Sequence, residues 1–327
     1  MSDPKAVAEA LSRAQSVLIL SHANPDGDAV GSALGLMWAL RRRRVHARVA
    51  LSDPVPPTLA FLPGAEEIDG ADVVDAPDVC VVLDSSSPNH VGDLFEHVTA
   101  CGCLIVNVDH HVTNGRFGHV NWIDPSSPAV AQMIYRLLPL LGIRPDPQIA
   151  TCLLTGFVTD TNGFSTPNTT PRLLRDAAEL MAAGASLAEI MRQAFLNRSL
   201  TQVRLWAHAL QTLCFEEGVV WTVNTPAMRQ AVGATERDSS DLSTFLLTIR
   251  EAHVAASFTV LDDGRVKVSL RAKPGYNVAQ VAARFGGGGH PPAAGATLEC
   301  SLDEAVESVV SALKAQVSGH TAEVKRS

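Results

Sequence analysis

Carboxylate and imidazole side chains gather in four short segments of this 327-residue chain. Three of the segments, 22–28, 84–86 and 109–111, directly follow apolar runs typical of β-strands, and the fourth ends a helical run at a glycine. Open α/β sheets bind ligands outside the carboxyl ends of their strands, so we expect these side chains to converge on one site. They are His22, Asp26, Asp28, Asp84, Asp109, His110, His111 and Asp160.

The side-chain types in this set are typical of a metal centre. Each aspartate alone has an ordinary explanation, because an aspartate after a strand usually caps a helix or a turn. Packed together without cations, the carboxylates would repel one another and their pKa values would rise. Carboxylates with imidazoles and no thiolate suit Mn²⁺, Co²⁺ or Fe²⁺ better than structural zinc. The ligands suffice for two divalent ions, Mn²⁺ first and Co²⁺ as the alternative, and paired ions are the usual device for hydrolysing phosphate esters.

The elements that must position these side chains follow from the apolar pattern. Short, almost continuously apolar runs are typical of strands in a sheet that is covered on both faces. They alternate with helix-length segments, and this rhythm predicts an α/β domain with a parallel sheet and right-handed crossovers. We expect strands at 16–21, 45–51, 79–83 and 104–108, and helices at 29–44, 128–141, 148–159 and 170–183.

A smaller α/β domain follows. The turn Asp262-Asp263-Gly264 between two apolar runs is a strong hairpin signal. We place the N-terminal domain at 1–190, a linker at 191–203 and the C-terminal domain at 204–327. Beyond residue 184 we expect helices at 187–196, 201–213, 241–250, 278–284 and 302–317, and strands at 219–224, 253–261, 265–271 and 294–299.

A glycine run in the second domain is a candidate phosphate site. Four consecutive glycines, Gly286–Gly289, could form a flexible linker, but the apolar sequence on both sides belongs to a packed domain. Glycines allow a close approach, so backbone N–H groups can cradle a phosphate. Arg271 could clamp the same phosphate, although a surface salt bridge is its alternative explanation. We predict that the substrate is bound by Arg271, Gly287, Gly288, Gly289 and His290.

Composition excludes several classes of protein. The net charge of −8 argues against binding to long duplex nucleic acid, and aromatics at 5% argue against a stacking platform for single strands. No apolar run approaches the ~18–20 residues of a membrane span, and the start has no secretory pattern. Cys80 and Cys152 lie in apolar runs, as buried thiols in a reducing compartment do, so we expect a cytoplasmic protein.

The motifs of the four segments, taken together, resemble those of the DHH phosphoesterase family. They are H-x-N-P-D-G-D-A-V-G-S at 22–32, V-L-D-S-S at 82–86, V-D-H-H at 108–111 and T-D-T-N-G-F at 159–164. S-L-R at 269–271 and F-G-G-G-G-H at 285–290 resemble the DHH-associated substrate-binding domain. The whole most resembles the bifunctional oligoribonuclease and pAp phosphatase subgroup, the nanoRNases. The chain departs from many relatives at 128–132, where a Ser/Thr and a Glu that open the next helix are missing.

The resemblance implies a role for each residue and an active site in the cleft between the domains. One ion would be held by His22, Asp26 and Asp84. The second would be held by Asp28, Asp84, His110 and Asp160, with Asp84 bridging the two ions. Asp109 and His111 would serve catalysis, His111 at the leaving group and Asp109 by orienting a histidine.

The implied function is two-metal hydrolysis of short substrates. These are oligonucleotides of about two to five nucleotides, linear or cyclic dinucleotides and 3′-phosphoadenosine 5′-phosphate (pAp). Two alternatives stay open: a hydrolase similar to inorganic pyrophosphatase or exopolyphosphatase, and a nucleotide sensor without catalysis. The expected partners are the substrate nucleotides and, as one arrangement to test, a second copy in a homodimer.

Overall fold

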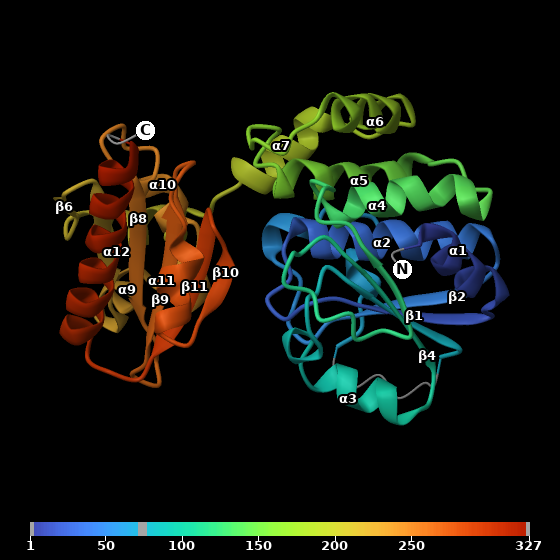
Figure 1. Cartoon of the computed structure of the whole chain (residues 1–327), viewed down its shortest axis with the longest axis horizontal. Helices are drawn as coiled ribbons and strands as arrows, with labels where there is room; N and C mark the ends of the chain where they lie inside the picture. The colour runs from blue at the N-terminus through green and yellow to red at the C-terminus, as the bar shows by residue number, and fades with distance from the viewer. Residues whose placement is uncertain (1–2, 71–76, 325–327) are drawn as a thin grey trace. The chain divides into compact units, whose positions relative to one another are not determined.

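The computed structural model describes residues 3–70 and 77–324 of the chain (Figure 1). The chain divides into two compact units, Met1–Asn197 and Arg198–Ser327. Of the predicted linker 191–203, only residues 196–199 lie outside helices, because α7 (Leu187–Phe195) and α8 (Leu200–Leu210) extend into it from both sides.

The first unit is built on a parallel sheet of five strands in the order β2-β1-β3-β4-β5. All four neighbouring pairs are parallel, as the alternation of strands and helices predicts. The fifth strand, β5, was not predicted, since it has only four residues and two of them are half-exposed. The strands are β1 (Ser16–Leu20), β2 (His46–Ala50), β3 (Val79–Leu83), β4 (Leu104–Asp109) and β5 (Val120–Ile123).

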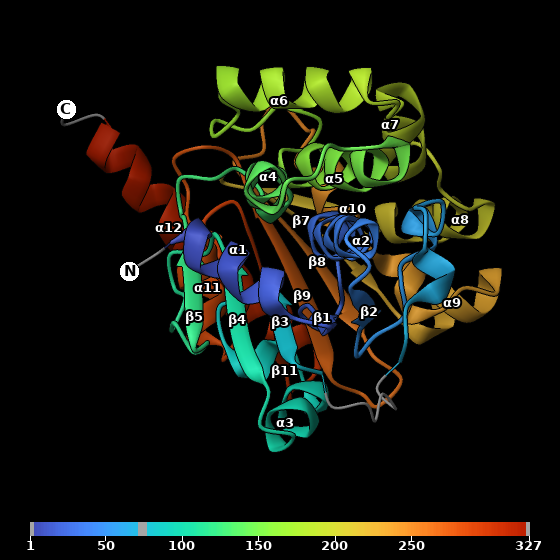
Figure 2. The same cartoon turned by 90° about the vertical axis from the view of Figure 1, so that its right-hand side faces the viewer.

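Helices cover both faces of this sheet (Figures 1 and 2). α1, α2, α4 and α5 share one large apolar core with the sheet, and α3 packs on the opposite face. The predicted helix 128–141 is divided, because a proline at 139 follows the α-helical part and the chain tightens into a 3₁₀ turn. The α-helices are α1 (Pro4–Arg13), α2 (Gly27–Arg42), α3 (Asp93–Ala100), α4 (Val130–Leu137), α5 (Pro147–Asp160), α6 (Pro171–Ala182) and α7. The 3₁₀ helices are η1 (Pro57–Leu59), η2 (Ala65–Glu67), η3 (Pro88–His90) and η4 (Leu138–Leu141).

A row of glycines brings α2 and α5 close together. Gly27, Gly31 and Gly35 recur every four residues and so share one face of α2. A Cβ at Gly31 would lie 2.5 Å from the carbonyl oxygen of Cys152, and one at Gly35 would lie 2.5 Å from Leu153 Cδ2. The two helices are antiparallel, because Gly27 faces Thr159 near the end of α5. The start of α2 therefore lies beside the end of α5.

The second unit is a six-stranded sheet in the order β10-β11-β9-β8-β7-β6, antiparallel except for the β7–β8 pair. α11 and α12 pack on one face and α10 on the other. The predicted hairpin is confirmed as β8–β9, whereas the predicted helix 241–250 is α-helical only over α10. The elements are β6 (Cys214–Glu216), β7 (Val219–Asn224), α9 (Pro226–Val232), η5 (Glu236–Ser239), α10 (Leu242–Leu246), β8 (Val254–Val260), β9 (Val266–Ala272), α11 (Val278–Arg284), β10 (Gly288–His290), β11 (Ala293–Leu298) and α12 (Leu302–Val324).

Among the helices of residues 3–70 and 77–324, none has the length and apolar character that a membrane crossing requires.

Candidate metal centre

The predicted ligands stand where their elements begin or end. β1, β3 and β4 are parallel neighbours, so their carboxyl ends meet at one edge of the sheet. Asp84 directly follows β3, and Asp109 is the last residue of β4. Asp84 has a φ of +54°, a left-handed backbone conformation that residues other than glycine rarely adopt. Strain of this kind is typical of functional sites.

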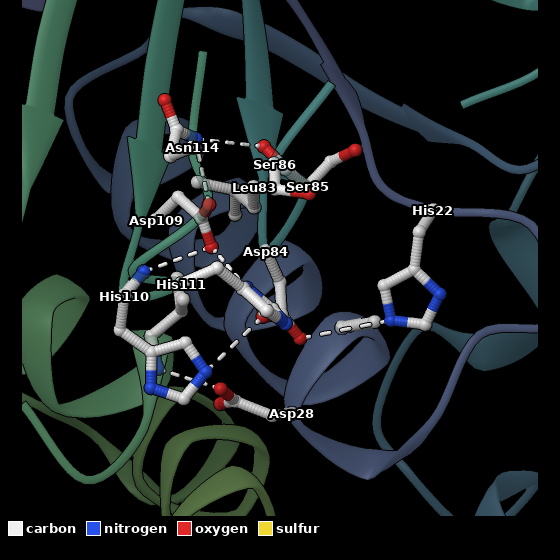
Figure 3. A network of polar contacts seen from close by, with 12 residues as sticks. His22, Asp28, Leu83, Asp84, Ser85, Ser86, Asp109, His110, His111 and Asn114 are labelled. Atoms are coloured by element: carbon white, nitrogen blue, oxygen red, sulfur yellow. Dashed lines mark hydrogen bonds and ion pairs between the residues drawn. The ribbon is translucent and has the colours of Figure 1, made fainter. Parts of the chain in front are cut away.

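Asp84 lies at the centre of the site, where it is 4% exposed. Its Oδ2 is 3.7 Å from His22 Nε2, and its Oδ1 is 3.5 Å from His110 Nε2. His111 Nδ1 lies 3.6 Å from the same Oδ1. Figure 3 shows the three imidazoles around this one carboxylate. Side chains from three separate strand ends therefore meet at a single buried acid.

The remaining predicted ligands complete two groups of donor atoms, each spanning no more than 4.8 Å. The first group is His22, Asp26 and Asp84, and the second is Asp28, His110 and Asp160. His110 Nε2 connects the groups, because it is 3.5 Å from Asp84 and 3.6 Å from Asp160. The structure thus brings together all six residues predicted as metal ligands.

A third group, Asp84, His110 and His111, has a different character. The His111 nitrogen that faces Asp84 is Nδ1, and this nitrogen is 2.6 Å from Asp109 Oδ1. A hydrogen bond this short to a carboxylate occupies Nδ1 with a proton. This hydrogen bond to Asp109 orients the His111 ring and leaves Nδ1 unavailable as a ligand.

The backbone sets the tautomers of the other two histidines. His22 Nδ1 lies 2.8 Å from the carbonyl oxygen of Ala23, and His110 Nδ1 lies 3.0 Å from that of Ser127. A carbonyl oxygen only accepts, so Nδ1 carries the proton in both rings. Nε2 is therefore the nitrogen that faces the carboxylates in each ring, and in a neutral ring it would offer its lone pair to a metal ion, as in a metal-ligating histidine.

The charges of the cluster fit divalent cations. Burial raises the pKa of Asp160 to about 7, with the nearby Asp84 and Asp26 adding to the effect. Burial alone lowers the pKa of His22, but Asp84 and Asp26 outweigh it and raise the pKa to about 10. Within the described residues, Asp84 Oδ1 is a buried oxygen that accepts no hydrogen bond. A cation between these oxygens would relieve their repulsion and satisfy this acceptor.

Asp26 and Asp28 also cap helices, as aspartates after a strand usually do, but each caps a different helix. Asp26 caps α2, since its Oδ1 accepts the N–H groups of Asp28 and Ala29 at 3.0 Å. Asp28 caps α4, since its two oxygens accept the N–H groups of Val130 at 2.6 Å and of Ala131 at 2.9 Å. A carboxylate oxygen has two lone pairs, so these caps leave capacity for an ion.

Comparison with known proteins identifies the family of the chain. The DHH family, N-terminal domain, matches residues 16–157, and the DHHA1 domain matches residues 224–319. Over 95% of its length the chain is 39% identical to the bifunctional oligoribonuclease and PAP phosphatase NrnA of Thermus thermophilus, 93% of which is covered. The chain belongs to the DHH family.

Two further relatives extend the comparison. The protein of the same name from Bacillus subtilis is 29% identical to this DHH-family chain, over 89% of the chain and 91% of the relative. The crystal structure of an exopolyphosphatase-related protein from Bacteroides fragilis matches with a TM-score of 0.90 and 23% identity, covering 97% of both chains. The latter shows a shared fold. Membership of the DHH family makes this chain a hydrolytic enzyme, and the carboxylate–imidazole groups suit the divalent ions on which the family depends.

The second unit of this DHH-family chain places two predicted substrate residues in one row. Arg271 on β9 pairs with Ala293 on β11, and Ala293 pairs with His290 on β10. Directly opposed residues of antiparallel strands point to the same face, so Arg271 and His290 flank the small Ala293. Arg271 donates hydrogen bonds to Thr244 Oγ1 at 3.2 Å and to the carbonyl oxygen of Leu270 at 3.0 Å, and among residues 3–70 and 77–324 it does not form the alternative salt bridge.

The glycine run is less of a loop than expected. Gly288 and Gly289 belong to β10, which pairs with β11. A Cβ at Gly287 would lie 2.1 Å from the carbonyl oxygen of Gly295, and one at Gly289 would lie 2.5 Å from that of Ala293. These two glycines are therefore required by the close approach of β10 to β11. Gly288, like Gly286, is exposed and has open space beside it.

Sequence reasoning missed four polar residues beside the ligands. Asn107 and Asn114 both donate to the loop after β3, and Asn114 also donates to Asp109. The carbonyl oxygen of Ser127 contacts His110, and the Ser127 hydroxyl donates to Gln132. Asn107 within an apolar strand, and Asn114 shortly after the two histidines, were the only available signals.

Proposed function

We propose that this hydrolytic enzyme cleaves phosphate esters of short nucleotides: oligonucleotides of about two to five nucleotides, linear or cyclic dinucleotides and pAp. The observation that carries the proposal is the meeting of five candidate ligands with a sixth, the buried Asp84, whose Oδ1 has no hydrogen-bond partner among the described residues. The activities for which the Thermus thermophilus relative is named, oligoribonuclease and PAP phosphatase, support the substrate class.

The six ligands would hold two divalent ions. His22, Asp26 and Asp84 would hold one, and Asp28, Asp84, His110 and Asp160 the other, so that Asp84 is shared. When bound, such ions acidify a water for attack on phosphorus and neutralise charge on the phosphate oxygens. We propose that both ions are Mn²⁺, with Co²⁺ as the alternative, because the ligands are carboxylates and imidazoles.

His111 and Asp109 would handle the proton of the leaving group. Asp109 is fully buried and accepts from His111 Nδ1, so it fixes the ring and stabilises its protonated form. Burial lowers the pKa of His111, but Asp109 and Asp84 outweigh this and raise it. With Nδ1 engaged, Nε2 is the nitrogen that would pass a proton to the departing oxygen.

Arg271, His290 and Gly288 would bind a phosphate in the second unit, with Gly287 and Gly289 shaping the strand that carries them. Burial lowers the pKa of Arg271, but its ordinary value is so high that the guanidinium stays charged. A charged group already held by Thr244 and Leu270 is suited to a bidentate phosphate contact.

A substrate panel tests the proposal. Purified protein with Mn²⁺, Co²⁺ or Mg²⁺ is given pAp, a dinucleotide, cyclic di-AMP, a long single strand and pyrophosphate, and released products are measured. We expect turnover of the short nucleotides, loss of it in Asp84→Ala, and its retention in Asp93→Asn on the exposed face of α3. Faster cleavage of the long strand, or turnover of pyrophosphate alone, would refute the substrate class. No turnover at all would favour the sensor.

Two further proposals concern the setting of the enzyme. The six cysteines are all free thiols, three of them buried, which supports a reducing compartment such as the cytoplasm. A homodimer is proposed as the oligomeric state, and light scattering of the eluting protein would decide between one copy and two.

A further inference from the structure

Asn114 lies in the loop after β4 and connects this loop to the loop after β3. Its Nδ2 is 2.6 Å from Asp109 Oδ2, 2.9 Å from Asn107 Oδ1 and 3.1 Å from the carbonyl oxygen of Ser85. Figure 3 shows the side chain reaching from its own loop to both Asp109 and Ser85. One amide group therefore contacts the residue after Asp84 and the carboxylate that holds His111.

The orientation of this amide follows from its other end. Asn114 Oδ1 accepts the backbone N–H of Arg116 at 2.7 Å, and a backbone nitrogen can only donate. The oxygen is thereby assigned, and Nδ2 must face the three acceptors. Asp109 Oδ2 therefore accepts a hydrogen bond from Asn114 Nδ2.

Asn107, on β4, helps to hold the Asn114 amide against Asp109, because its Oδ1 accepts from Asn114 Nδ2. It is fully buried, and its Nδ2 donates to the carbonyl oxygens of Val82 and Ser85, both at 3.2 Å. Since Nδ2 is committed to β3 and its loop, Oδ1 is left to accept from Asn114. The two asparagines form a short chain of hydrogen bonds that ends on Asp109.

Asp109 depends on this hydrogen-bond chain because its side chain is shielded from solvent and must find its donors within the protein. It is 0% exposed, and its Oδ1 accepts from the backbone N–H of His110 at 2.8 Å and from His111 Nδ1. Its Oδ2 accepts from Asn114. A buried carboxyl group without such donors would keep unsatisfied oxygens, so these three hydrogen bonds hold the Asp109 side chain where it accepts from His111 Nδ1.

We propose that Asn114 is a positioning residue for catalysis, which acts through Asp109 to fix the orientation and tautomer of His111. The inference rests on the proposed phosphoester hydrolysis only for the step that His111 performs. The hydrogen-bond chain itself is a property of the folded protein and can be measured without substrate.

The test compares three variants by melting, kinetics and NMR of ¹⁵N-labelled histidine. Asn114→Ala removes the donor, and Asn114→Asp keeps the shape while placing a second carboxylate against Asp109. Asn121→Ala is the matched control, because Asn121 makes two hydrogen bonds, at 2.6 and 3.1 Å, to Gly118 in the loop that also carries Asn114. It loses loop contacts of the same kind without touching Asp109.

We expect both Asn114 variants to lower kcat about 10- to 100-fold, with KM and Mn²⁺ affinity within about threefold of the wild type. The Nδ1–H signal of His111 in metal-free protein should be protected from water exchange in the wild type and in Asn121→Ala, and lost in both Asn114 variants. An unchanged His111 signal in folded variants would overturn the proposal. So would a loss of Mn²⁺ affinity equal to the loss of kcat, which would place the action of Asn114 on Asp84. A wild type that turns over no substrate would refute the proposed function, while the His111 signal would still decide this inference.

Discussion

The charge of Asp84 should control how strongly divalent ions stabilise the first unit. Asp84 is a member of two of the three donor groups, and Asp84→Asn keeps its shape while removing the charge that faces His22 and His110. An ion present at about 100 times its Kd stabilises the folded state by about 2.7 kcal/mol. In a unit of residues 1–197 this raises the melting temperature by about 5 to 11 °C.

Loss of the shared ligand should nearly abolish that increase. If Asp84→Asn weakens binding about 100-fold, the same ion concentration equals Kd and contributes about 0.4 kcal/mol, or about 1 to 2 °C. Scanning calorimetry with EDTA and with Mn²⁺ measures both shifts, and each protein is compared only with itself. Asp93→Asn should behave as the wild type. If Asp84→Asn keeps more than half of the wild-type shift, the ions do not depend on this carboxylate and the assignment fails.

Three further outcomes are expected. Asp28→Ala removes both acceptors that cap α4, so urea unfolding in the presence of EDTA should show a loss of about 1 to 3 kcal/mol in the free energy of unfolding. Asp160→Ala should lose less under the same conditions. Equal losses in the two variants would contradict the capping role of Asp28. Gly287→Ala should destabilise the second unit by about 1 to 3 kcal/mol, because its Cβ would lie 2.1 Å from a carbonyl oxygen of β11, whereas Gly288→Ala should be near neutral in the same melts. Asp78 accepts hydrogen bonds from backbone N–H groups at the start of β1, and these hydrogen bonds lower the pKa of Asp78 in the folded protein. Ionised Asp78 therefore stabilises the fold above the ordinary aspartate pKa. This contribution is lost as the pH falls through the lowered pKa of the folded state. The melting-temperature gap between wild type and Asp78→Ala should therefore be full at pH 7 and narrow below about pH 4; a gap that widens in acid would show the opposite sign.

The sheet of the first unit was predictable because its strands are buried on both faces. Residues 79–83 are all apolar and all buried, so the pattern that sequence reasoning relies on is undiluted there. β5 has only two buried residues, and its pairing with β4 depends on tertiary contacts. The short β10 was expected as a loop, because glycine has low strand propensity and its pairing with β11 depends on close backbone approach.

The candidate ligands were predictable as a set, and their supporting contacts were not. The types of His22, Asp84 and His110, together with their positions after strands, point to a cation site without any coordinates. Asp28 capping α4 joins residues 102 positions apart, and no local pattern encodes such a pair. The direction of the Asn114 amide is set by one backbone N–H in a loop, which also lies beyond what sequence spacing can show.

The glycine row of α2 has a consequence for the reactive end of that helix. Gly31 lies one repeat from Gly27, about 6 Å along the axis, and a Cβ there would lie 2.5 Å from the backbone carbonyl oxygen of Cys152, which cannot turn aside as a side chain can. A side chain at Gly31 would push α2 away from α5 and lengthen the gap between Asp28 and Asp160. The spacing of these two candidate ligands thus depends on residues that carry no chemistry of their own, and a single methyl group one helical turn away would alter it.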